Sequence, residues 1–340
     1  MNELHQFSEQ MRQAVNAEMK AVLQATHETP NPFYGMLHYH MGWRDENLQP
    51  ADVNAGKQIR PVMCLLACQA AGGDWQQAVP AAAAIELLHN FSLIHDDIED
   101  ASPTRRGRKT LWTIWGMEQA LNVGDAMFAL AHLALARLVD RGVSAETAVI
   151  ALRRFDETCL ALTQGQHGDM DFERREVVSV DEYLAMIRGK TAVLVSLCTE
   201  LGALIAGADS QTVDHYAQFG LNLGLAFQVI DDILGIWGDE AVIGKSASTD
   251  ILTKKKTLPV LYGLNHNGAL RQLYQQPQTD EAFVQQAIQV LNTTGARDYA
   301  IERATFYSDN ALQHLEAAEP SGPAYTALNQ LSAMLLQRDF

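Results

Sequence analysis

Long apolar segments with helical period account for most of this 340-residue chain, and two of them end in closely spaced aspartates. Segments with the alternation typical of β-strands are scarce. The helical segments are apolar over much of their circumference, which is typical of helices surrounded by other helices. The sequence therefore predicts an all-α bundle, formed as a single domain over residues 1–340 with accessory helices over about 266–340.

Capping signals indicate where several of these helices begin and end. Pro80 precedes an apolar helix expected over about 81–100. Asp209 or Ser210 is expected to cap a helix that ends near residue 234. The spacing of Ser179 and Glu182 fits a capping box, which opens a helix expected to run past residue 199.

The two aspartate runs have the sequences HDDIED (95–100) and QVIDDILG (228–235). On a helix, Asp96 and Asp100 lie one turn apart on one face, so their like charges destabilise the helix unless a cation binds. Mg²⁺ favours carboxylate oxygens and commonly bridges one or two carboxylates to substrate phosphates. Two such clusters, far apart in sequence, suggest two walls that hold one diphosphate through metal ions.

The composition of the chain argues against several classes of function. The chain has 25 basic and 41 acidic side chains, a formal charge of −16, which argues against a nucleic-acid partner because such surfaces are basic. The four cysteines form no Cys-x-x-Cys pair, which argues against a zinc or redox site. The first twenty residues lack the apolar core of a signal peptide, and uninterrupted apolar runs are too short to span a bilayer. We therefore expect a cytoplasmic protein without a transmembrane segment.

Basic residues lie beside the first acidic cluster and upstream of it. Lys57 and Arg60 are three residues apart and would point the same way from the first turn of a helix. Arg105 and Arg106 follow the first cluster almost directly. Because arginine binds phosphate oxygens bidentately, we favour a diphosphate site over a surface loop that only neutralises the aspartates.

Other polar residues are compatible with more than one role. Lys190 follows a glycine in an apolar helix, where a lysine more often reaches the surface than acts, although the glycine suggests a local break in the helix. Glu86 and His89 have the spacing of a di-iron Glu-x-x-His motif, but a second such motif is missing from the sequence. His89 is therefore expected to be a phosphate donor or a core histidine. His38 and His40 are interpreted as structural.

These motifs together resemble those of trans-isoprenyl diphosphate synthases of the polyprenyl synthetase family, the farnesyl and geranylgeranyl diphosphate synthases. The matching phrases occur in the family's order and span about residues 50–265: GKQIRP (56–61), HNFSLIHDDIEDASPTRRGRKTLW (89–112), GDAMFALA (124–131), QGQHGDMDF (164–172), GKTAVLV (189–195), FQVIDDILGIWGDE (227–240) and GKSASTDILTKKKTLPVLYGL (244–264). The resemblance implies long antiparallel helices around a central cavity, a homodimer, three Mg²⁺ ions per active site and two diphosphate substrates.

The resemblance also implies a role for each matching residue. Metal ions on the allylic diphosphate would be held by Asp96, Asp97, Asp100, Asp231 and Asp232. The same diphosphate would contact Arg105, Lys190 and Lys255, whereas isopentenyl diphosphate would bind Lys57, Arg60, His89 and Arg106. The catalytic residues Lys190, Thr191 and Gln228 would line the carbocation region.

The implied reaction is head-to-tail prenyl transfer. The C–O bond of the allylic diphosphate ionises, the isopentenyl double bond attacks the allylic cation, and a proton is lost to the released diphosphate. Metal ions and basic side chains stabilise the charge on the leaving diphosphate. Phe91 lies five residues before Asp96, about 7.5 Å back along the helix axis, with Ser92 one turn before Asp96. A bulky aromatic at this place resembles a floor that shortens the product, which predicts a C15–C20 all-trans product.

One position departs from the family pattern. Gly235 stands where many members have the third aspartate of the second acidic motif. Asp231 and Asp232 can still supply metal-binding oxygens, and Asp239 is another candidate source of a carboxylate.

Two other functions use related motifs. A class I terpene cyclase also ionises a prenyl diphosphate at an aspartate-rich helix, but it needs no second diphosphate site, which Lys57, Arg60 and the Arg105–Arg106 pair indicate. A regulatory subunit of another prenyl synthase is expected to lose its metal-binding aspartates, whereas the first cluster here is complete. The missing second Glu-x-x-His disfavours a di-iron oxidase.

Overall fold

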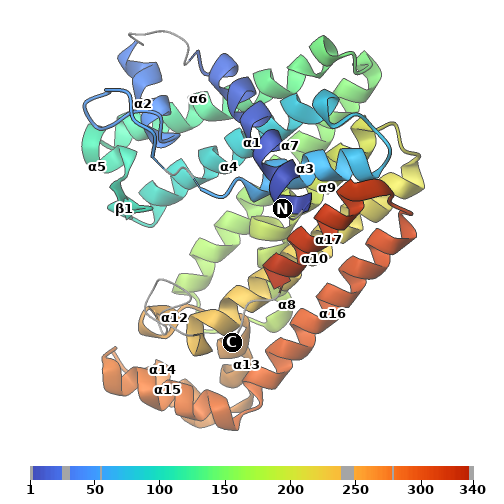
Figure 1. Ribbon diagram of the computed structural model, residues 1–340. Coiled ribbons are helices and arrows are strands. Elements are labelled where there is room, and N and C mark those ends of the chain that lie inside the picture. Colours follow the sequence, from blue (N-terminus) through green and yellow to red (C-terminus); the bar gives the residue numbers. More distant parts are fainter. Residues whose placement is uncertain (1–2, 25–30, 54–55, 239–248, 278, 337–340) are drawn as a thin grey trace. The chain divides into compact units, whose positions relative to one another are not determined.

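The computed structural model describes residues 3–24, 31–53, 56–238, 249–277 and 279–336 (Figure 1). The described residues are helical almost throughout, which confirms the all-α prediction. They divide into two compact units: Met1–Arg154 with Cys198–Val213 and Pro320–Leu328, and Phe155–Leu197 with Asp214–Glu319 and Asn329–Phe340. The expectation that one domain covers the whole chain stays a prediction.

The first unit is built around α4 (Val79–Glu99), which packs extensively against α6 (Met117–Ala136). Four consecutive alanines of α4, residues 81–84, are fully buried, and their small side chains let neighbouring helices approach closely. The other elements are α1 (Glu3–Val22), α2 (Pro32–His40), α3 (Ile59–Ala70), η1 (Trp75–Ala78), β1 (Thr104–Arg105), β2 (Arg108–Lys109), α5 (Leu111–Trp115), η2 (Arg137–Arg141), and parts of α7 (Ala145–Arg174), α9 (Val193–Ile205), α10 (Ser210–Trp237) and α17 (Gly322–Leu336).

The second unit contains the remaining parts of α7, α9, α10 and α17, together with further helices. These are α8 (Val180–Ile187), the π-helix η3 (Arg188–Ala192), α12 (Thr249–Leu252), α13 (Leu258–His266), α14 (Gly268–Tyr274), α15 (Glu281–Thr293) and α16 (Ala296–Ala317). In this unit α13 packs against α8 and α16, and α14 packs against α15.

The predicted capping signals are present. Ser179 and Glu182 form a reciprocal capping box at the start of α8, and the helical path continues through η3 into α9. The side chain of Asp209 accepts hydrogen bonds from the backbone N–H groups of Gln211 and Thr212 at the start of α10. Pro80 lies in the first turn of α4. Local sequence therefore defines these helix ends, as expected.

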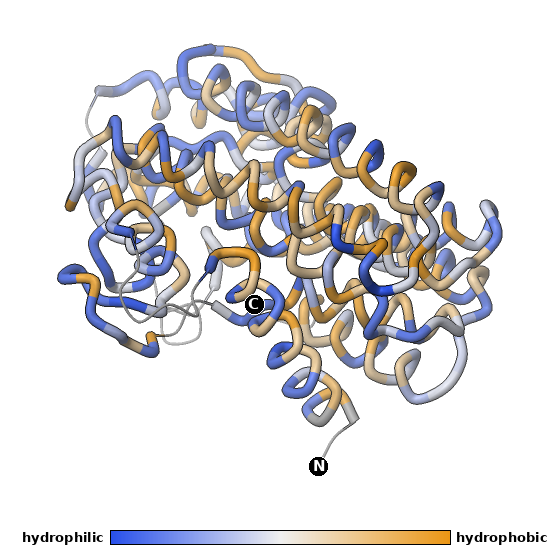
Figure 2. Tube along the Cα trace, turned by 90° about the horizontal axis from the view of Figure 1, so that it is seen from above, coloured by the Kyte–Doolittle hydropathy of each residue, from blue (hydrophilic) through white to orange (hydrophobic). Residues whose placement is uncertain are grey.

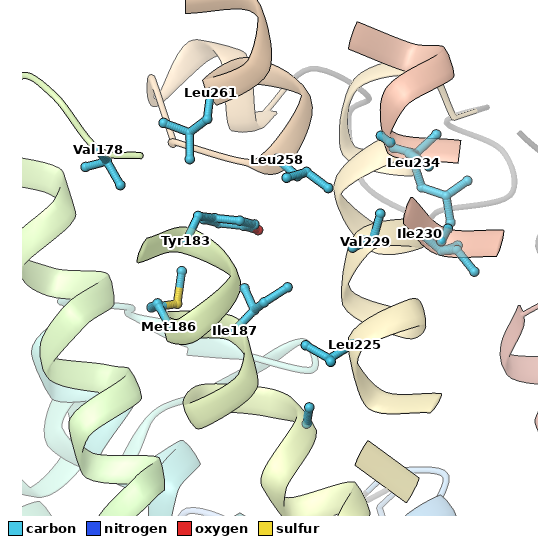
Figure 3. Close-up of a cluster of buried hydrophobic side chains, with 14 of the residues drawn as sticks. Val178, Tyr183, Met186, Ile187, Leu225, Val229, Ile230, Leu234, Leu258 and Leu261 are labelled. Atoms are coloured by element: carbon cyan, nitrogen blue, oxygen red, sulfur yellow. The ribbon is translucent and has the colours of Figure 1, made fainter. Parts of the chain in front are cut away.

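The core of the second unit joins α8, α10 and α13. Figure 3 shows Met186 and Ile187 of α8 on one side of this cluster. Leu225 and Val229 of α10 lie on the facing side. Tyr183 is buried in the same cluster with its hydroxyl group directed toward α10. A phenol buried in this way requires a hydrogen-bond partner, and its partner lies in the second acidic run.

Two helices of the structure are long and apolar enough to cross a membrane by length and composition, Met117–Arg141 and Ser210–Trp237. Figure 2 shows hydrophobic residues along much of several helices. Within the apolar windows of these two helices, 44% and 72% of the residues are buried. Scattered polar residues interrupt the apolar runs of both helices, but the mean hydropathy of each helix stays high. Core helices of soluble proteins have the same properties, so the finding is weak evidence for a membrane span.

Candidate active site

The first acidic cluster lies at the C-terminal end of α4. The backbone N–H of Asp100 donates to the carbonyl of Asp96 at 2.8 Å, so these two residues lie one helical turn apart, as predicted. Asp100 is exposed, whereas Asp97 is buried. A helix C-terminus carries partial negative charge, which adds to the charge of the carboxylates. This end of the helix therefore favours cations.

One cation is supplied by the chain itself. Nε of Arg105 donates to Oδ1 of Asp97 at 2.7 Å. Burial raises the pKa of Asp97, and the charge of Arg105 partly opposes that rise. Asp97 is thus already engaged by a protein group, while its predicted role as a metal ligand stays a prediction.

Arg105 is positioned by a two-stranded hairpin, β1 and β2, in which Arg105 pairs with Arg108. The two residues of the turn, Arg106 and Gly107, have φ values of +53° and +74°. Positive φ at both positions is what a tight type I′ hairpin turn requires, and glycine adopts it readily. The basic segment is therefore a two-stranded hairpin directly after the acidic cluster.

A basic cavity lies beside the hairpin. It is lined by Tyr39, His40, Asp97, Arg105, Arg106, Arg108, Lys109, Thr110 and Leu111. Nη1 of Arg60 lies 3.4 Å from Nε2 of His89, so two residues predicted to bind isopentenyl diphosphate are adjacent. Burial, followed by the charges of Arg60 and Arg106, lowers the pKa of His89 well below its usual value. Lys57 is exposed near the start of α3.

Arg106 lies close to the backbone at Gly56. A Cβ at Gly56 would come within 2.8 Å of a guanidinium nitrogen of Arg106. The absence of a side chain at this position therefore leaves room for the arginine. This contact links the GKQIRP phrase to the hairpin, which are about fifty residues apart in sequence.

Glu86 is a buried carboxylate near the basic residues Arg60 and Arg106, and it was not predicted to take part in the site. Nδ2 of Asn90 donates to Oε1 of Glu86 at 3.3 Å, and both residues are buried. Burial raises the pKa of Glu86, while the charges of Arg60 and Arg106 lower it. The only sequence signal was its place in Glu-x-x-His, and its surroundings are basic side chains rather than iron ligands.

The predicted product-length residues lie one to two turns before the acidic cluster on α4. The ring of Phe91 lies 5.0 Å from the ring of Phe128 on α6, between centroids, and 4.7 Å from that of His95. The hydroxyl group of Ser92 donates to the carbonyl of His89 at 2.8 Å. Phe91 therefore belongs to an aromatic cluster that joins α4 and α6, which is compatible with a floor.

In the second unit, the helix break suspected beside Lys190 is the π-helix η3. Gly165 of α7 approaches this segment so closely that a Cβ there would lie 2.2 Å from the backbone nitrogen of Lys190. Nζ of Lys190 forms an ion pair with Oδ2 of Asp169 at 2.5 Å. Sequence reasoning did not single out Asp169, although it belongs to the QGQHGDMDF phrase. π-Helical turns often occur at functional sites.

The second acidic run contains one exposed and one buried aspartate. Asp231 is exposed, whereas Asp232 is buried and accepts three hydrogen bonds: from the Tyr183 hydroxyl at 2.5 Å, the Leu258 backbone N–H at 3.1 Å and the Gln228 amide at 3.3 Å. Burial raises the pKa of Asp232 to about 6. Asp232 thus links α8, α10 and α13. Its role as a metal ligand stays a prediction.

The remaining predicted residues lie near this carboxylate. The hydroxyl of Thr191 donates to Oε1 of Gln228 at 3.0 Å, so these two predicted catalytic residues are in contact. Lys255 is exposed, and its charge lowers the pKa of Asp232. Asp239, the candidate replacement for the missing third aspartate, lies outside the described residues.

The carboxylates present fit Mg²⁺ that is shared with a diphosphate. Among the described residues, groups of three or more His, Cys, Asp or Glu side chains arranged for a metal ion are absent. Mg²⁺ does not need such a cage, because it usually keeps several waters and takes one or two carboxylates together with substrate phosphates. Asp96 and Asp100, one turn apart, offer this kind of donor set.

The chain matches one known family and several known proteins over most of its length. The family model for polyprenyl synthetase matches residues 45–291. A geranylgeranyl diphosphate synthase from Mycobacterium tuberculosis is 40% identical over 313 residues, which cover 91% of this chain and 87% of that protein. A (2E,6E)-farnesyl diphosphate synthase from Mycobacterium bovis is 44% identical over 234 residues, covering 69% of this chain and 64% of that protein.

Solved structures agree with these sequence matches. A polyprenyl synthetase from Streptomyces coelicolor A3(2) is similar with a TM-score of 0.88 and 32% identity, covering 98% of this chain and 99% of that one. A geranylgeranyl pyrophosphate synthetase from Pyrococcus horikoshii has a TM-score of 0.87 and 31% identity, covering 99% and 98%. The predicted family is confirmed: this chain belongs to the polyprenyl synthetase family and has its all-α fold.

Proposed function

We propose that this protein is a prenyltransferase that joins an allylic diphosphate to isopentenyl diphosphate, head to tail, and releases diphosphate. The observation that carries the proposal lies within the first unit. There, the acidic end of α4 is followed directly by a hairpin whose Arg105 binds Asp97. Beside it, Arg60 and His89 are adjacent in a basic environment. One region suits a metal-bound diphosphate, and the other suits a diphosphate bound by basic side chains alone.

Each group of residues has a distinct task in this reaction. Arg60, Arg106 and Lys57 hold the diphosphate of isopentenyl diphosphate, and His89 donates a hydrogen bond to it as a neutral imidazole. The lowered pKa of His89 keeps its ring uncharged near pH 7. Arg105, Lys190 and Lys255 contact the allylic diphosphate and stabilise the negative charge that develops as its C–O bond breaks.

The π-helix η3 and its neighbours act on the allylic cation that forms when the C–O bond breaks. The carbonyl groups near Lys190, with the Thr191 hydroxyl and the Gln228 amide, present oxygen atoms that stabilise an allylic cation. The hydrogen bond between Thr191 and Gln228 fixes both side chains. The isopentenyl double bond then attacks the cation, and the lost proton goes to the released diphosphate.

Magnesium is the cofactor that fits the carboxylates, and we propose three ions per active site, as in the family that the motifs resemble. Bound Mg²⁺ would neutralise charge on the leaving diphosphate. Asp96, Asp97 and Asp100 would supply oxygens from α4, and Asp231 and Asp232 from α10. Asp97 and Asp232 already accept hydrogen bonds from protein groups, which leaves fewer of their lone pairs for a metal.

We propose a C15–C20 all-trans product, with Phe91 as part of the floor that limits its length. Relatives named for farnesyl and geranylgeranyl diphosphate support this range. The cluster of Phe91 and Phe128 supports a bulky barrier on α4 and α6.

We further propose that the enzyme works as a cytoplasmic homodimer. Helix α6 exposes large apolar side chains at Met117, Leu121 and Leu133. A second copy of the chain would cover them. The 72% burial of the apolar window in α10 supports its role as a core helix rather than a membrane span.

The decisive experiment incubates the purified protein and Mg²⁺ with C5, C10 or C15 allylic diphosphates, with and without isopentenyl diphosphate. Mass spectrometry of the products should show chains lengthened by C5 units only when isopentenyl diphosphate is present. A cyclic terpene formed without it would identify a terpene cyclase. No conversion under either condition would contradict an enzymatic role and favour a regulatory subunit.

A further inference from the structure

The second acidic run lacks a third aspartate, and the structure identifies a carboxylate in its place. Gly235 follows Asp231 by four residues on α10, so the two positions lie one turn apart on the same face of the helix. This is the spacing of Asp96 and Asp100 on α4. An aspartate at position 235 would therefore place its carboxylate beside that of Asp231.

The space where that side chain would begin is filled by Asp250 of α12. A Cβ built on Gly235 would lie 2.5 Å from Oδ2 of Asp250, 3.3 Å from its Cγ and 3.9 Å from its Cβ. The distances increase from the oxygen back to the Cβ, so the Asp250 side chain points at Gly235 with its carboxylate first. A side chain at position 235 would clash with the carboxylate of Asp250, so this placement of Asp250 requires glycine there.

The placement of Asp250 is determined by its neighbours in the chain. Ile251, the next residue, is fully buried in a core cluster with residues of α13, α14 and α15. On the other side, the backbone carbonyl of Asp250 accepts a hydrogen bond from the N–H of Lys255 at 2.8 Å. Lys255 is a predicted contact of the allylic diphosphate. Core packing therefore holds Asp250 next to a residue of the proposed site.

We propose that Asp250 replaces the missing third aspartate of the second acidic run, and that Asp231 of α10 and Asp250 of α12 together hold a magnesium ion. This inference rests on the proposed function, because the ion would be shared with a diphosphate. Two carboxylates with water and phosphate oxygens make up the coordination that Mg²⁺ favours. Glycine at position 235 then does not abolish metal binding by the second acidic run. Because glycine has no side chain, it leaves room for the carboxylate of Asp250.

Binding of Mn²⁺ in the presence of inorganic diphosphate, followed by electron paramagnetic resonance, tests this proposal without relying on activity. Asp250→Asn should weaken the binding of one Mn²⁺ per chain by about 10-fold or more, since losing a metal-site carboxylate costs at least as much as losing an outer-shell partner. Gly235→Ala should weaken it as well, because the new methyl group displaces the Asp250 carboxylate. That carboxylate is the flexible end of a side chain, so the variant should still fold.

The double variant Gly235→Asp/Asp250→Gly moves the carboxylate from α12 to α10 and should restore binding. Asp214→Asn, an exposed aspartate on the same helix, and Gly268→Ala, whose Cβ would meet nothing within 4 Å, are the controls and should bind Mn²⁺ as the wild type does. Circular dichroism should show the same helix content in every variant.

Unchanged Mn²⁺ binding in folded Asp250→Asn and Gly235→Ala variants would overturn the proposal, as would a double variant that binds no better than either single one. The product assay with isopentenyl diphosphate distinguishes this failure from failure of the proposed function. If the wild type makes no prenyl product but the two single variants lose a Mn²⁺ ion, the metal assignment stands and the proposed reaction is wrong.

Discussion

Single residues in the basic cavity are held in a particular charge state by their neighbours, and His40 is the clearest case. Burial, together with the charges of Arg106 and Arg105, lowers the pKa of His40 from 6.5 to about 3. Between these two values the unfolded chain binds more protons than the folded chain, so the free energy of unfolding falls as the pH falls below about 6.5. Going from pH 7.5 to pH 5, this one group costs at most about 2 kcal/mol.

We therefore expect His40→Asn to reduce the loss of stability on acidification. Urea unfolding at pH 7.5 and pH 5 should show a difference in unfolding free energy that is smaller in the variant by up to about 2 kcal/mol. His266→Asn is the control, because His266 is exposed in the second unit. Equal acid sensitivity of wild type and His40→Asn would contradict a His40 that stays neutral in the folded chain.

The size of the product should depend on Phe91. Phe91→Ala removes a ring that packs against Phe128 and opens space along α4. We expect the main product to lengthen by at least one C5 unit, measured by mass spectrometry after incubation with isopentenyl diphosphate. Phe306→Ala, which removes an exposed ring from α16, should leave the product unchanged. An identical product from Phe91→Ala would exclude Phe91 as the floor.

Residue types and their spacing singled out many candidate site residues, but they did not predict which side chains pair. The pairing of Arg105 with Asp97 and of Thr191 with Gln228 joins residues that the motifs had already singled out. Tyr183 carried no such signal, because a tyrosine at an apolar helical position looks like ordinary core. Its hydrogen bond to Asp232 depends on how α8 packs against α10, which helical periodicity does not specify.

Among the helices, the meeting of α7 with η3 is the contact most sensitive to substitution. A Cβ at Gly165 would lie 2.2 Å from the backbone nitrogen of Lys190 and 2.6 Å from the carbonyl carbon of Gly189. Both are backbone atoms, so the segment itself must move to accommodate a side chain. Overpacking of this kind typically costs about 1–3 kcal/mol.

Gly165→Ala should therefore lower the free energy of unfolding by about 1–3 kcal/mol and reduce kcat, because it displaces Lys190 from its ion pair with Asp169. Gly168→Ala on the same helix is a matched control, since its Cβ would make an ordinary contact at 3.4 Å with Met186. In that variant alanine also favours the helix by about 1 kcal/mol over glycine. Urea unfolding and steady-state kinetics would measure both effects, and equal behaviour of the two variants would contradict the close approach.

The type and position of the helices were largely predictable, because caps and apolar periodicity are local signals. Pro80 and the Ser179–Glu182 box marked the starts of α4 and α8 within about two residues. The small hairpin was not predicted as strands, since Thr104–Lys109 is too short for a period-two pattern. Its tight turn follows from positive φ at Arg106 and Gly107, and only the glycine signals that from sequence.

For the protein as a whole, the exposed apolar side chains of α6 indicate where a second copy of the chain would bind. Met117, Leu121 and Leu133 are 51%, 42% and 60% exposed in the single chain. Covering such side chains is favourable by roughly 25 cal/mol for each square ångström of apolar surface removed from water. A second copy of the chain, seated on α6, would remove them from water. The wild type should therefore sediment at about 75 kDa, twice the 37.5 kDa of one chain.

Charged substitutions on α6 should shift this equilibrium toward the monomer. In Leu121→Glu/Leu133→Glu, each copy would bury unpaired carboxylates at the contact, which is strongly unfavourable. Analytical ultracentrifugation should then show a dissociation constant at least about 100-fold weaker, equivalent to roughly 2.7 kcal/mol. Leu312→Glu on α16, whose side chain is 41% exposed, should leave the dimer intact. A wild type that sediments as a monomer, or a double variant that dimerises as tightly as the wild type, would exclude α6 as the contact between copies.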